Sequence, residues 1–240
     1  MEERWSRWDS AGQGHIRAIY DSMDSKDPNK ATLLNHISQF DLEGALNLWS
    51  TGRALLDAHQ VSERSSETKE LSIEPFRGAL AFPERESPEK RAEWRNIGLE
   101  AIRCGQVCAL TMAGGQGTRL GSAEPKGSLD IGLASHKCLF QLIAERLIRL
   151  SELAGGKSIK WFVMTSPATH RRTEELLEEK KWFGLCRDDV ILFQQDEIPC
   201  FTLNGKIMLE SPGKIATSPN GNGGIYKALE TSGSLKLMKK

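Results

Sequence analysis

The amino-acid sequence predicts an α/β fold, in which a mainly parallel β-sheet is flanked by helices and preceded by a helical amino-terminal region. From residue 106 onward, short apolar runs alternate with segments whose apolar residues recur at helical spacing, as in successive β–α–β units. A glycine-rich run follows the first of these apolar runs directly. We therefore predict two parts: a helical region with a linker at residues 1–104, and an α/β domain at residues 105–240.

The helical region is predicted from apolar periodicity at residues 12–24 and 31–57. The polar composition of residues 60–95 is typical of a surface connection, and it leads into a further helix near residues 90–103. The residues that mark the buried faces are Ile16, Ile19, Tyr20 and Met23 in the first segment, and Leu33, Leu34, Ile37, Leu42, Leu46 and Trp49 in the second.

The α/β domain is predicted from the order of its apolar runs. The expected elements are a strand at 106–112, a helix at 137–153 that stops at Gly155, a strand at 159–165, a helix that Ser166 caps and that runs to about residue 181, and a strand at 190–193. Asn204 and Gly205 then predict a hairpin over 201–209 with a type I′ turn. Right-handed crossovers would bring the carboxyl ends of the three strands to one edge, where ligands bind in such folds.

Composition limits the class of function. Thirty-two basic residues balance thirty-two acidic ones, so overall charge does not favour binding to nucleic acid or to an anionic membrane. The amino terminus has no apolar signal segment, and no apolar run is long enough to span a bilayer. Five cysteines without a Cys-x-x-Cys pair favour a reducing, cytoplasmic location, in which we expect all five to be small buried residues.

The glycine-rich run at residues 110–127 also carries two cations, Arg119 and Lys126. It lacks the Gly-Lys-Ser/Thr ending of a P-loop, and its glycines are spaced one residue too widely for a dinucleotide-binding fingerprint. A loop that cradles a nucleoside triphosphate fits better: glycine N–H groups hold the nucleotide, Arg119 balances the β- and γ-phosphates, and Lys126 balances the α-phosphate. This arrangement suits nucleotidyl transfer, which depends on positioning and charge neutralisation.

Several ordered motifs extend beyond this loop and resemble the landmarks of the eukaryotic UDP-sugar pyrophosphorylases, most closely those that make UDP-N-acetylglucosamine. The motifs are Gly-Gly-Gln-Gly-Thr-Arg-Leu-Gly at 114–121, Pro-Lys-Gly at 125–127, Asp-Ile-Gly-Leu at 130–133, Leu-Phe-Gln at 139–141 followed by Glu-Arg at 145–146, Met-Thr-Ser at 164–166, Phe-Gln-Gln at 193–195 and Pro-Asn-Gly-Asn-Gly-Gly at 219–224. The segment Ala-Gly-Gln-Gly-His at 11–15 is similar to the start of the family.

The resemblance implies a Rossmann-like nucleotidyltransferase fold and a set of site residues. It implies that UTP and N-acetylglucosamine 1-phosphate are the substrates, that Mg²⁺ shields the phosphate charge, and that no covalent enzyme intermediate forms. Arg119 would face the leaving pyrophosphate, and Asn222 would hydrogen-bond the amino sugar. The residues implied to contact UTP are Met112, Ala113, Gly114 and Gly115 through the backbone, Lys126 at the phosphates, and Gln195 with Gly221 near the uracil.

The resemblance also leaves alternatives open. Family members continue well past residues 219–224, so we expect a carboxy-terminally shortened chain, an incomplete sheet and a metal ligand that lies outside this sequence; no residue here is assigned to a metal. The chain is then either a cytoplasmic UDP-N-acetylglucosamine-forming uridylyltransferase or a catalytically dead fragment that binds UTP or a partner. Glucose or galactosamine 1-phosphates are alternative substrates, and the oligomeric state is not predicted. Glu124 also places a negative charge two residues from Lys126.

Overall fold

The computed structural model describes residues 2–64, 74–76, 78, 82–116, 121 and 124–239. Contacts divide the chain into two compact units: Met1–Phe76 with Glu197–Ser218, and Arg77–Asp196 with Pro219–Lys240. This division differs from the predicted boundary between residues 104 and 105. There are two reasons: the helix at residues 88–103 packs with the α/β part of the chain, and residues 197–218 leave that part and join the amino-terminal helices.

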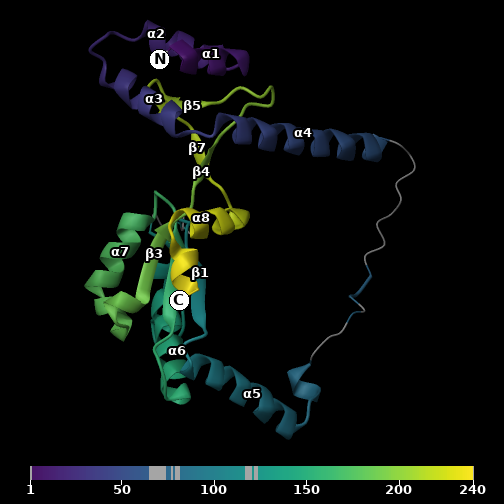
Figure 1. Ribbon diagram of the computed structural model, residues 1–240, viewed down its shortest axis with the longest axis vertical. Helices are drawn as coiled ribbons and strands as arrows, with labels where there is room; N and C mark the ends of the chain where they lie inside the picture. The colour runs from purple at the N-terminus through teal and green to yellow at the C-terminus, as the bar shows by residue number, and fades with distance from the viewer. Residues whose placement is uncertain are drawn as a thin grey trace. The chain divides into compact units, whose positions relative to one another are not determined.

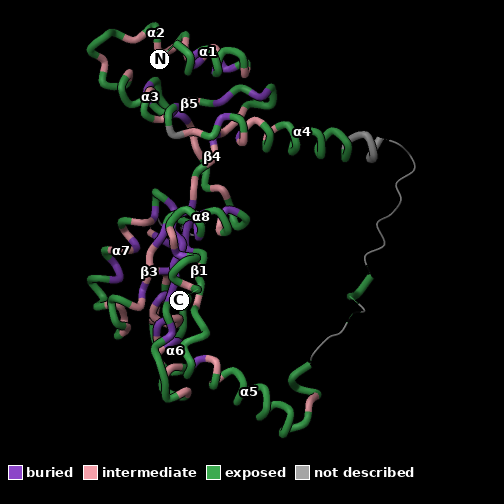
Figure 2. Tube along the Cα trace, viewed as in Figure 1, coloured by how far each residue is buried: buried purple, intermediate pink, exposed green. Residues whose placement is uncertain are grey.

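The described part of the first unit contains four helices, three of which lie on the predicted helical segments. The four are α1 (Glu2–Ser10), α2 (Gly14–Ser22), α3 (Pro28–Gln39) and α4 (Leu42–Arg64). The segment predicted at 31–57 is divided into α3 and α4, and α4 runs to Arg64, into the stretch that was predicted as a surface connection. Helix α1 was not predicted because only Trp5 and Trp8 mark its buried face, and each of these side chains is 2% exposed. Figure 2 shows that much of α4 is exposed.

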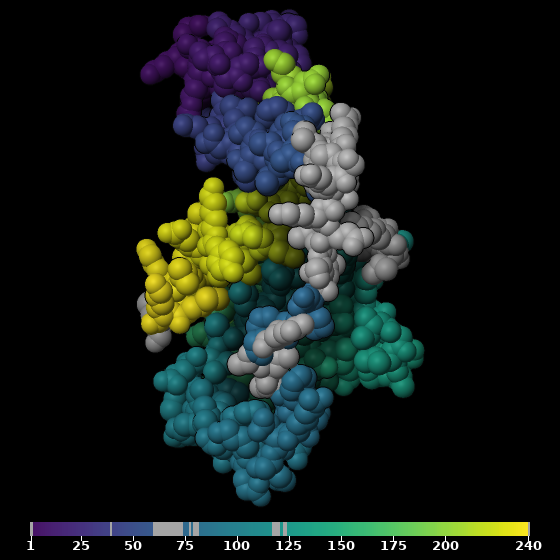
Figure 3. Space-filling view, turned by 90° about the vertical axis from the view of Figure 1, so that its right-hand side faces the viewer, coloured from purple at the N-terminus to yellow at the C-terminus, as the bar shows by residue number. Residues whose placement is uncertain are grey.

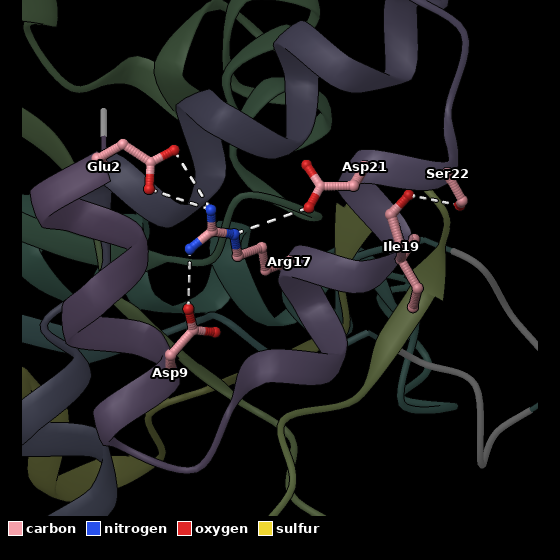
Figure 4. A network of polar contacts seen from close by, with 6 residues as sticks. All are labelled: Glu2, Asp9, Arg17, Ile19, Asp21 and Ser22. Atoms are coloured by element: carbon pink, nitrogen blue, oxygen red, sulfur yellow. Dashed lines mark hydrogen bonds and ion pairs between the residues drawn. The ribbon is translucent and has the colours of Figure 1, made fainter.

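Helices α1 and α2 are joined by an arginine at the centre of an ion-pair network (Figure 4). Arg17 of α2 contacts Glu2 and Asp9 of α1, with nitrogen-to-oxygen distances of 3.0 Å in each pair, and contacts Asp21 of its own helix at 3.7 Å. The hydrogen bond to Asp9 is the main reason that the pKa of the Arg17 guanidinium lies above its ordinary value. The network therefore links both ends of α1 to α2.

Residues 197–218 add four short strands to this unit. They are β4 (Glu197–Pro199), β5 (Leu209–Ser211), β6 (Lys214–Ile215) and β7 (Thr217–Pro219), of which β4 pairs with β7 and β5 with β6. The buried side chains of Ile207 and Ile215 complete the core cluster of the helices. Gln13, also buried, donates to the Gly205 carbonyl oxygen and accepts from the Ile207 N–H, each at 2.8 Å.

The hairpin at 201–209 forms as predicted, but its turn is not type I′. A type I′ turn needs a positive φ at both central residues, and here Gly205 has a φ of 75° while Asn204 does not have a positive φ. The N–H of Gly205 donates to the Thr202 carbonyl oxygen, and the N–H of Thr202 donates to the Lys206 carbonyl oxygen. The loop is therefore one residue longer than predicted. The extra residue lets Gly205 alone take the left-handed conformation.

The second unit contains the predicted parallel sheet (Figure 1). Its strands are β1 (Cys108–Met112), β2 (Lys160–Thr165) and β3 (Val190–Gln194), in the order β1-β2-β3. Met112 lies beside Met164, and Thr165 lies beside Gln194, so the three carboxyl ends are level with one another. The described sheet has these three strands, and Met112 on β1 is 53% exposed.

Helices cover both faces of the sheet. Side chains of β2 alternate: Trp161 and Val163 pack in the core cluster that holds α6 and α7, whereas Phe162 and Met164 pack in the cluster that holds α8. The side chains of α8 and α9 form one surface, which is yellow in Figure 3. The helices are α5 (Pro88–Arg103), α6 (Leu139–Ala154), α7 (His170–Glu179), α8 (Ile225–Thr231) and α9 (Ser234–Met238), and the short 3₁₀ turns are Pro83–Arg85, Lys126–Ser128, Lys181–Gly184, Arg187–Asp189 and Asn222–Gly224.

The start of α7 differs from the prediction. Ser166 was expected to cap this helix, but the helix begins at His170 and Ser166 lies in the preceding turn. The carbonyl oxygen of Ser166 accepts from the N–H groups of Thr169 and His170. The Ser166 hydroxyl is thereby free to bond outside its own helix.

The structure also bears on the expected burial of the cysteines and on membrane-spanning helices. The five cysteines are free, but Cys104, Cys108 and Cys186 are exposed, so the expectation that all five are buried was wrong. A hydrogen bond from the Cys104 thiol to Glu100 raises the pKa of that thiol. Within the part of the chain that the structure describes, no helix is both long enough and apolar enough to cross a membrane.

Candidate functional site

A cavity of about 500 Å³ opens at the carboxyl ends of the parallel strands in the second unit. Its wall is formed by the loop after β1, the residue after β3 and the segment that precedes α8. All eight residues that were predicted to bind substrate line this one cavity: Met112, Ala113, Gly114, Gly115, Lys126, Gln195, Gly221 and Asn222.

The loop after β1 is held by backbone and side-chain hydrogen bonds. The N–H of Ala113 donates to the Met164 carbonyl oxygen at 2.6 Å, which extends the β1–β2 pairing by one residue. The hydroxyl of Ser166 then donates to the Gly114 carbonyl oxygen at 2.8 Å. These bonds carry the backbone of Gly114 and Gly115 along the cavity wall in a defined orientation.

Gln195 lies directly against this glycine backbone. Its N–H donates to the Thr165 carbonyl oxygen at 2.8 Å, so it continues the β2–β3 pairing. The side chain is 6% exposed, and its Oε1 atom is buried without a hydrogen-bond partner among the described residues. A buried amide oxygen without a partner costs free energy, so the site favours a ligand that brings an N–H donor to it.

Lys126 approaches the same loop from its other end. The Lys126 N–H donates to the Gly115 carbonyl oxygen at 3.2 Å, and Gln116 forms an antiparallel bridge with Pro125. A Cβ atom added to Gly115 would lie 3.5 Å from Lys126 Nζ, so the ammonium group lies over the glycine backbone. A cation above the glycine backbone is a suitable site for an anionic ligand.

The charge of Glu124 is directed toward α7. Its carboxylate accepts from Arg172 Nε at 2.8 Å, and Arg172 also contacts Glu179 at 2.9 Å. These hydrogen bonds, first that of Glu179 and then that of Glu124, raise the pKa of the Arg172 guanidinium. Arg172 therefore offsets the negative charge that the sequence places two residues before Lys126.

The third wall segment enters from residues 219–222. The N–H of Asn220 donates to the Asp196 carbonyl oxygen at 3.1 Å, which joins this segment to the end of β3. Gly221 has a φ of 73°, a backbone conformation that residues with a Cβ rarely adopt. Asn222 follows at the start of a 3₁₀ turn and lines the cavity.

The structure does not place two parts of the predicted site, the side chain of Arg119 and the metal. Arg119 lies outside the described residues, so its predicted role stays a prediction. Within the described ranges, no three His, Cys, Asp or Glu side chains come together in a group that could hold a metal ion. Among the described residues that line the cavity there is no carboxylate, so these residues do not fit a Mg²⁺ site built by side chains alone.

Sequence reasoning missed the apolar part of the wall and the residues that orient the loop. Thr111, Gly127, Leu139, Phe140, Ile143, Met164 and Pro219 also line the cavity, but their patterns are those of core residues. Five of these residues lie within the family motifs, which could have indicated them: Gly127, Leu139, Phe140, Met164 and Pro219. A Cβ atom on Gly127 would lie 2.1 Å from Phe140 Cζ, so the Phe140 ring packs on the Gly127 backbone.

Known proteins resemble this chain in both sequence and structure. It is 37% identical over 251 residues to a "Probable UDP-N-acetylglucosamine pyrophosphorylase" of Dictyostelium discoideum, in an alignment that covers 100% of this chain and 49% of that protein. It is 36% identical to the "UDP-N-acetylglucosamine pyrophosphorylase" of Saccharomyces cerevisiae, with 92% and 46% covered. The chain spans about half the length of the curated relatives it matches.

A solved structure gives the same result. The crystal structure of the uridine diphosphate N-acetylglucosamine pyrophosphorylase from Trypanosoma brucei, in complex with an inhibitor, superposes with a TM-score of 0.69 and 29% sequence identity. The superposition covers 95% of this chain and 45% of that chain. The predicted α/β fold of nucleotidyltransferase type is thereby confirmed.

A family model described as "UTP--glucose-1-phosphate uridylyltransferase" matches residues 60–240, which include the glycine loop, Lys126, Gln195 and the segment 219–222. The chain therefore belongs to the UTP--glucose-1-phosphate uridylyltransferase family.

Proposed function

We propose that the cavity binds UTP and that the protein transfers the uridylyl group of UTP to N-acetylglucosamine 1-phosphate, which yields UDP-N-acetylglucosamine and diphosphate. One observation carries the proposal: the glycine loop, a lysine, a buried glutamine and an asparagine line one cavity although they are far apart in the sequence. The names of the relatives support the choice of nucleotide and sugar.

The buried amide of Gln195 is matched to the uracil end of the nucleotide. Uracil offers an N–H donor next to carbonyl acceptors, and the partnerless Oε1 atom of Gln195 is an acceptor for such an N–H. A cytosine ring has an acceptor in place of that N–H. Gln195 would therefore favour UTP over CTP, because the wrong ring leaves two buried acceptors facing each other.

The phosphate end of the nucleotide then lies along the glycine loop. Glycine N–H groups hydrogen-bond phosphate oxygens, and Lys126 supplies a cation where charge develops. A phosphate oxygen of the sugar phosphate attacks the α-phosphorus of UTP. A new O–P bond forms while the bond from the α-phosphorus to the α,β-bridging oxygen breaks, and diphosphate leaves with that electron pair. The protein contributes position and charge and forms no covalent bond.

Asn222 is proposed to bind the amino sugar, and Arg119 to face the leaving diphosphate. Asn222 lines the same cavity as Lys126, which is the placement that contact with a sugar phosphate near the reacting phosphorus requires. An asparagine amide both donates and accepts, so it can pair with sugar hydroxyl groups or with an N-acetyl group. Mg²⁺ as a counterion of the nucleotide and a cytoplasmic location are further proposals, the second supported by five free cysteines.

The test has two measurements on the purified 240-residue chain. Calorimetric titration compares UTP with CTP, and a diphosphate-release assay in Mg²⁺ buffer compares N-acetylglucosamine 1-phosphate, glucose 1-phosphate and no acceptor. We expect UTP binding and release that depends on the amino sugar. UTP binding without release would assign this chain nucleotide binding alone, and failure to bind UTP would overturn the proposal for this chain. Release with glucose 1-phosphate only would overturn the proposed acceptor.

A further inference from the structure

Three side chains at the entrance to α7 contact the glycine loop. Ser166, Thr169 and Arg172 follow one another at intervals of three residues, which places them on one side of the turn and of the helix that follows it. Ser166 contacts the loop segment before its tip and Arg172 contacts the segment after it. We call Ser166, Thr169 and Arg172 the α7 platform.

The Ser166 hydroxyl controls the direction of one peptide group. Ser166 is 1% exposed, and its hydroxyl donates to the Gly114 carbonyl oxygen at 2.8 Å. In a trans peptide the carbonyl group and the next N–H point in opposite directions. Because the Gly114 carbonyl points at Ser166, the N–H of Gly115 points away from Ser166, and Gly115 lines the cavity.

Thr169 holds the Ser166 residue in place. The buried Thr169 hydroxyl oxygen accepts from the Ser166 N–H at 3.1 Å, lies 3.1 Å from the Ser166 hydroxyl oxygen and reaches the Ala113 carbonyl oxygen at 3.4 Å. The capping role that would otherwise explain a serine before a helix is absent at Ser166, because α7 begins at His170. The two hydroxyls thus serve the loop after β1.

Arg172 holds the other segment of the loop. Its Nε atom donates to the Glu124 carboxylate at 2.8 Å, while Glu175 and Glu179 contact its Nη1 atom at 3.7 and 2.9 Å. Glu124 is two residues before Lys126, whose own N–H donates to Gly115. The Arg172 guanidinium is therefore held between α7 and the segment that carries Glu124 and Lys126.

We propose that the α7 platform consists of positioning residues, which together orient the Gly115 N–H and the Lys126 side chain for the phosphate groups of a nucleotide. The identity of that nucleotide rests on the proposed function, whereas the effect of the platform on the loop does not. Ser166 and Thr169 act on the peptide groups, and Arg172 acts on the cation.

The first experiment measures the loop without ligand. Amide hydrogen exchange by NMR on the 240-residue chain compares Ser166→Ala, Thr169→Val and Arg172→Ala with Arg171→Ala. Arg171 is a matched control, because it lies on the same helix with a side chain that is 91% exposed. Loss of one hydrogen bond that holds the loop should speed exchange of the Lys126 amide by about fivefold. Exchange at Phe162 in the central strand should stay unchanged.

The second experiment separates phosphate positioning from general damage. The same variants are titrated with UTP and with uridine, which lacks the phosphates. We expect UTP affinity to fall by about tenfold in Ser166→Ala and Arg172→Ala, uridine affinity to stay constant, and Arg171→Ala to match the unaltered chain.

The outcomes are distinguishable. If the exchange rate of the Lys126 amide is unchanged in all three platform variants, these residues do not position the loop. If exchange is accelerated equally at Lys126 and Phe162, their role is merely structural. Equal losses of UTP and uridine affinity overturn the positioning role as well. If the unaltered chain binds neither ligand, the proposed function has failed for this chain, and the exchange rates of Lys126 still decide the role of the platform.

Discussion

The side-chain amide of Gln195 rests on the backbone of Gly114. A Cβ atom built on Gly114 would lie 2.1 Å from Gln195 Nε2, a separation at which one of the two groups must move. The contact joins the residue that follows β3 to the loop that follows β1, across the central strand. The absence of a side chain at position 114 is therefore a condition for burying the glutamine in the cavity wall.

Gly114→Ala is the first prediction. The added methyl group should displace the Gln195 amide and weaken UTP binding by at least about tenfold, since a displaced hydrogen-bonding group costs roughly 1.5 kcal/mol or more. Gly98→Ala in α5 is the control, because nothing lies within 4 Å of a Cβ there. That change should leave UTP binding intact and raise helix stability by about 1 kcal/mol. Equal UTP affinity in both variants would contradict the steric argument.

Gln195→Met should separate stability from binding. Methionine keeps the approximate size of the side chain and removes a buried acceptor that has no partner among the described residues. Thermal stability should therefore stay constant or rise by about 1 kcal/mol, while the preference for UTP over CTP is lost. Melting temperature and paired titrations measure the two effects. A strong loss of stability with an intact UTP preference would remove Gln195 from nucleotide recognition.

Lys126→Ala should lower uridylyl transfer without comparable loss of stability. The exposed side chain over Gly115 has little packing role, whereas a cation placed at a developing charge contributes on the order of 3 kcal/mol, which corresponds to about a hundredfold in kcat. Lys236→Ala, at an exposed position in α9, is the control. The assay is diphosphate release at saturating UTP, with melting temperatures beside it. Parallel decreases in activity and in melting temperature would argue against a catalytic role.

Gln13→Ala should destabilise the first unit. The variant would leave the Gly205 carbonyl oxygen and the Ile207 N–H buried without their 2.8 Å partner, which costs about 2 to 4 kcal/mol. Denaturant unfolding, followed by tryptophan fluorescence, measures the loss, since Trp5 and Trp8 lie in the same core cluster. Asn35→Ala, at an exposed position of α3, should change stability by less than about 0.5 kcal/mol. Similar values for the two variants would be incompatible with the burial of Gln13.

The pair Glu100 and Arg103 in α5 predicts a pH dependence. The hydrogen bond from Arg103, followed by that from Cys104, lowers the pKa of the Glu100 carboxyl from 4.5 to about 2. The folded pKa is below the unfolded one, so the pair stabilises the helix above pH 4.5 and loses this effect as the pH falls toward 2. Carboxyl ¹³C NMR should place the midpoint of the Glu100 titration near pH 2. Arg103→Ala should raise the midpoint of the Glu100 titration, and Arg149→Ala should not. Equal midpoints in the two variants would show that Arg103 does not lower the pKa of Glu100.

Much of the second unit was predictable because its contacts are local or follow from strand order. Apolar runs separated by amphipathic helices fix parallel strands, and parallel strands bring the residues after β1 and β3 to one edge. That reasoning placed Gln195 and the glycine loop together. The roles of the site residues came from the resemblance instead, because periodicity says nothing about which polar side chain meets which ligand.

Some features depend on distant partners that a local sequence pattern does not show. Gln13 looks like a surface residue until it meets Gly205, which lies 192 positions away in the chain. Ser166 has the local pattern of a helix cap, but its hydroxyl finds a better acceptor on another loop. The turn at Gly205 was misjudged because the Asn-Gly pair fits more than one hairpin geometry, and the surrounding hydrogen bonds choose among them.

The hydrogen bond between the Asn220 N–H and the Asp196 carbonyl oxygen closes the base of the excursion at residues 197–218. This hydrogen bond joins two walls of the cavity directly, so their contact does not depend on the residues between them. Because loop-closure entropy rises only slowly with length, the second unit can contain an excursion of this length at little cost to the position of its cavity walls. The excursion can therefore complete the core of the first unit while the second unit keeps its cavity.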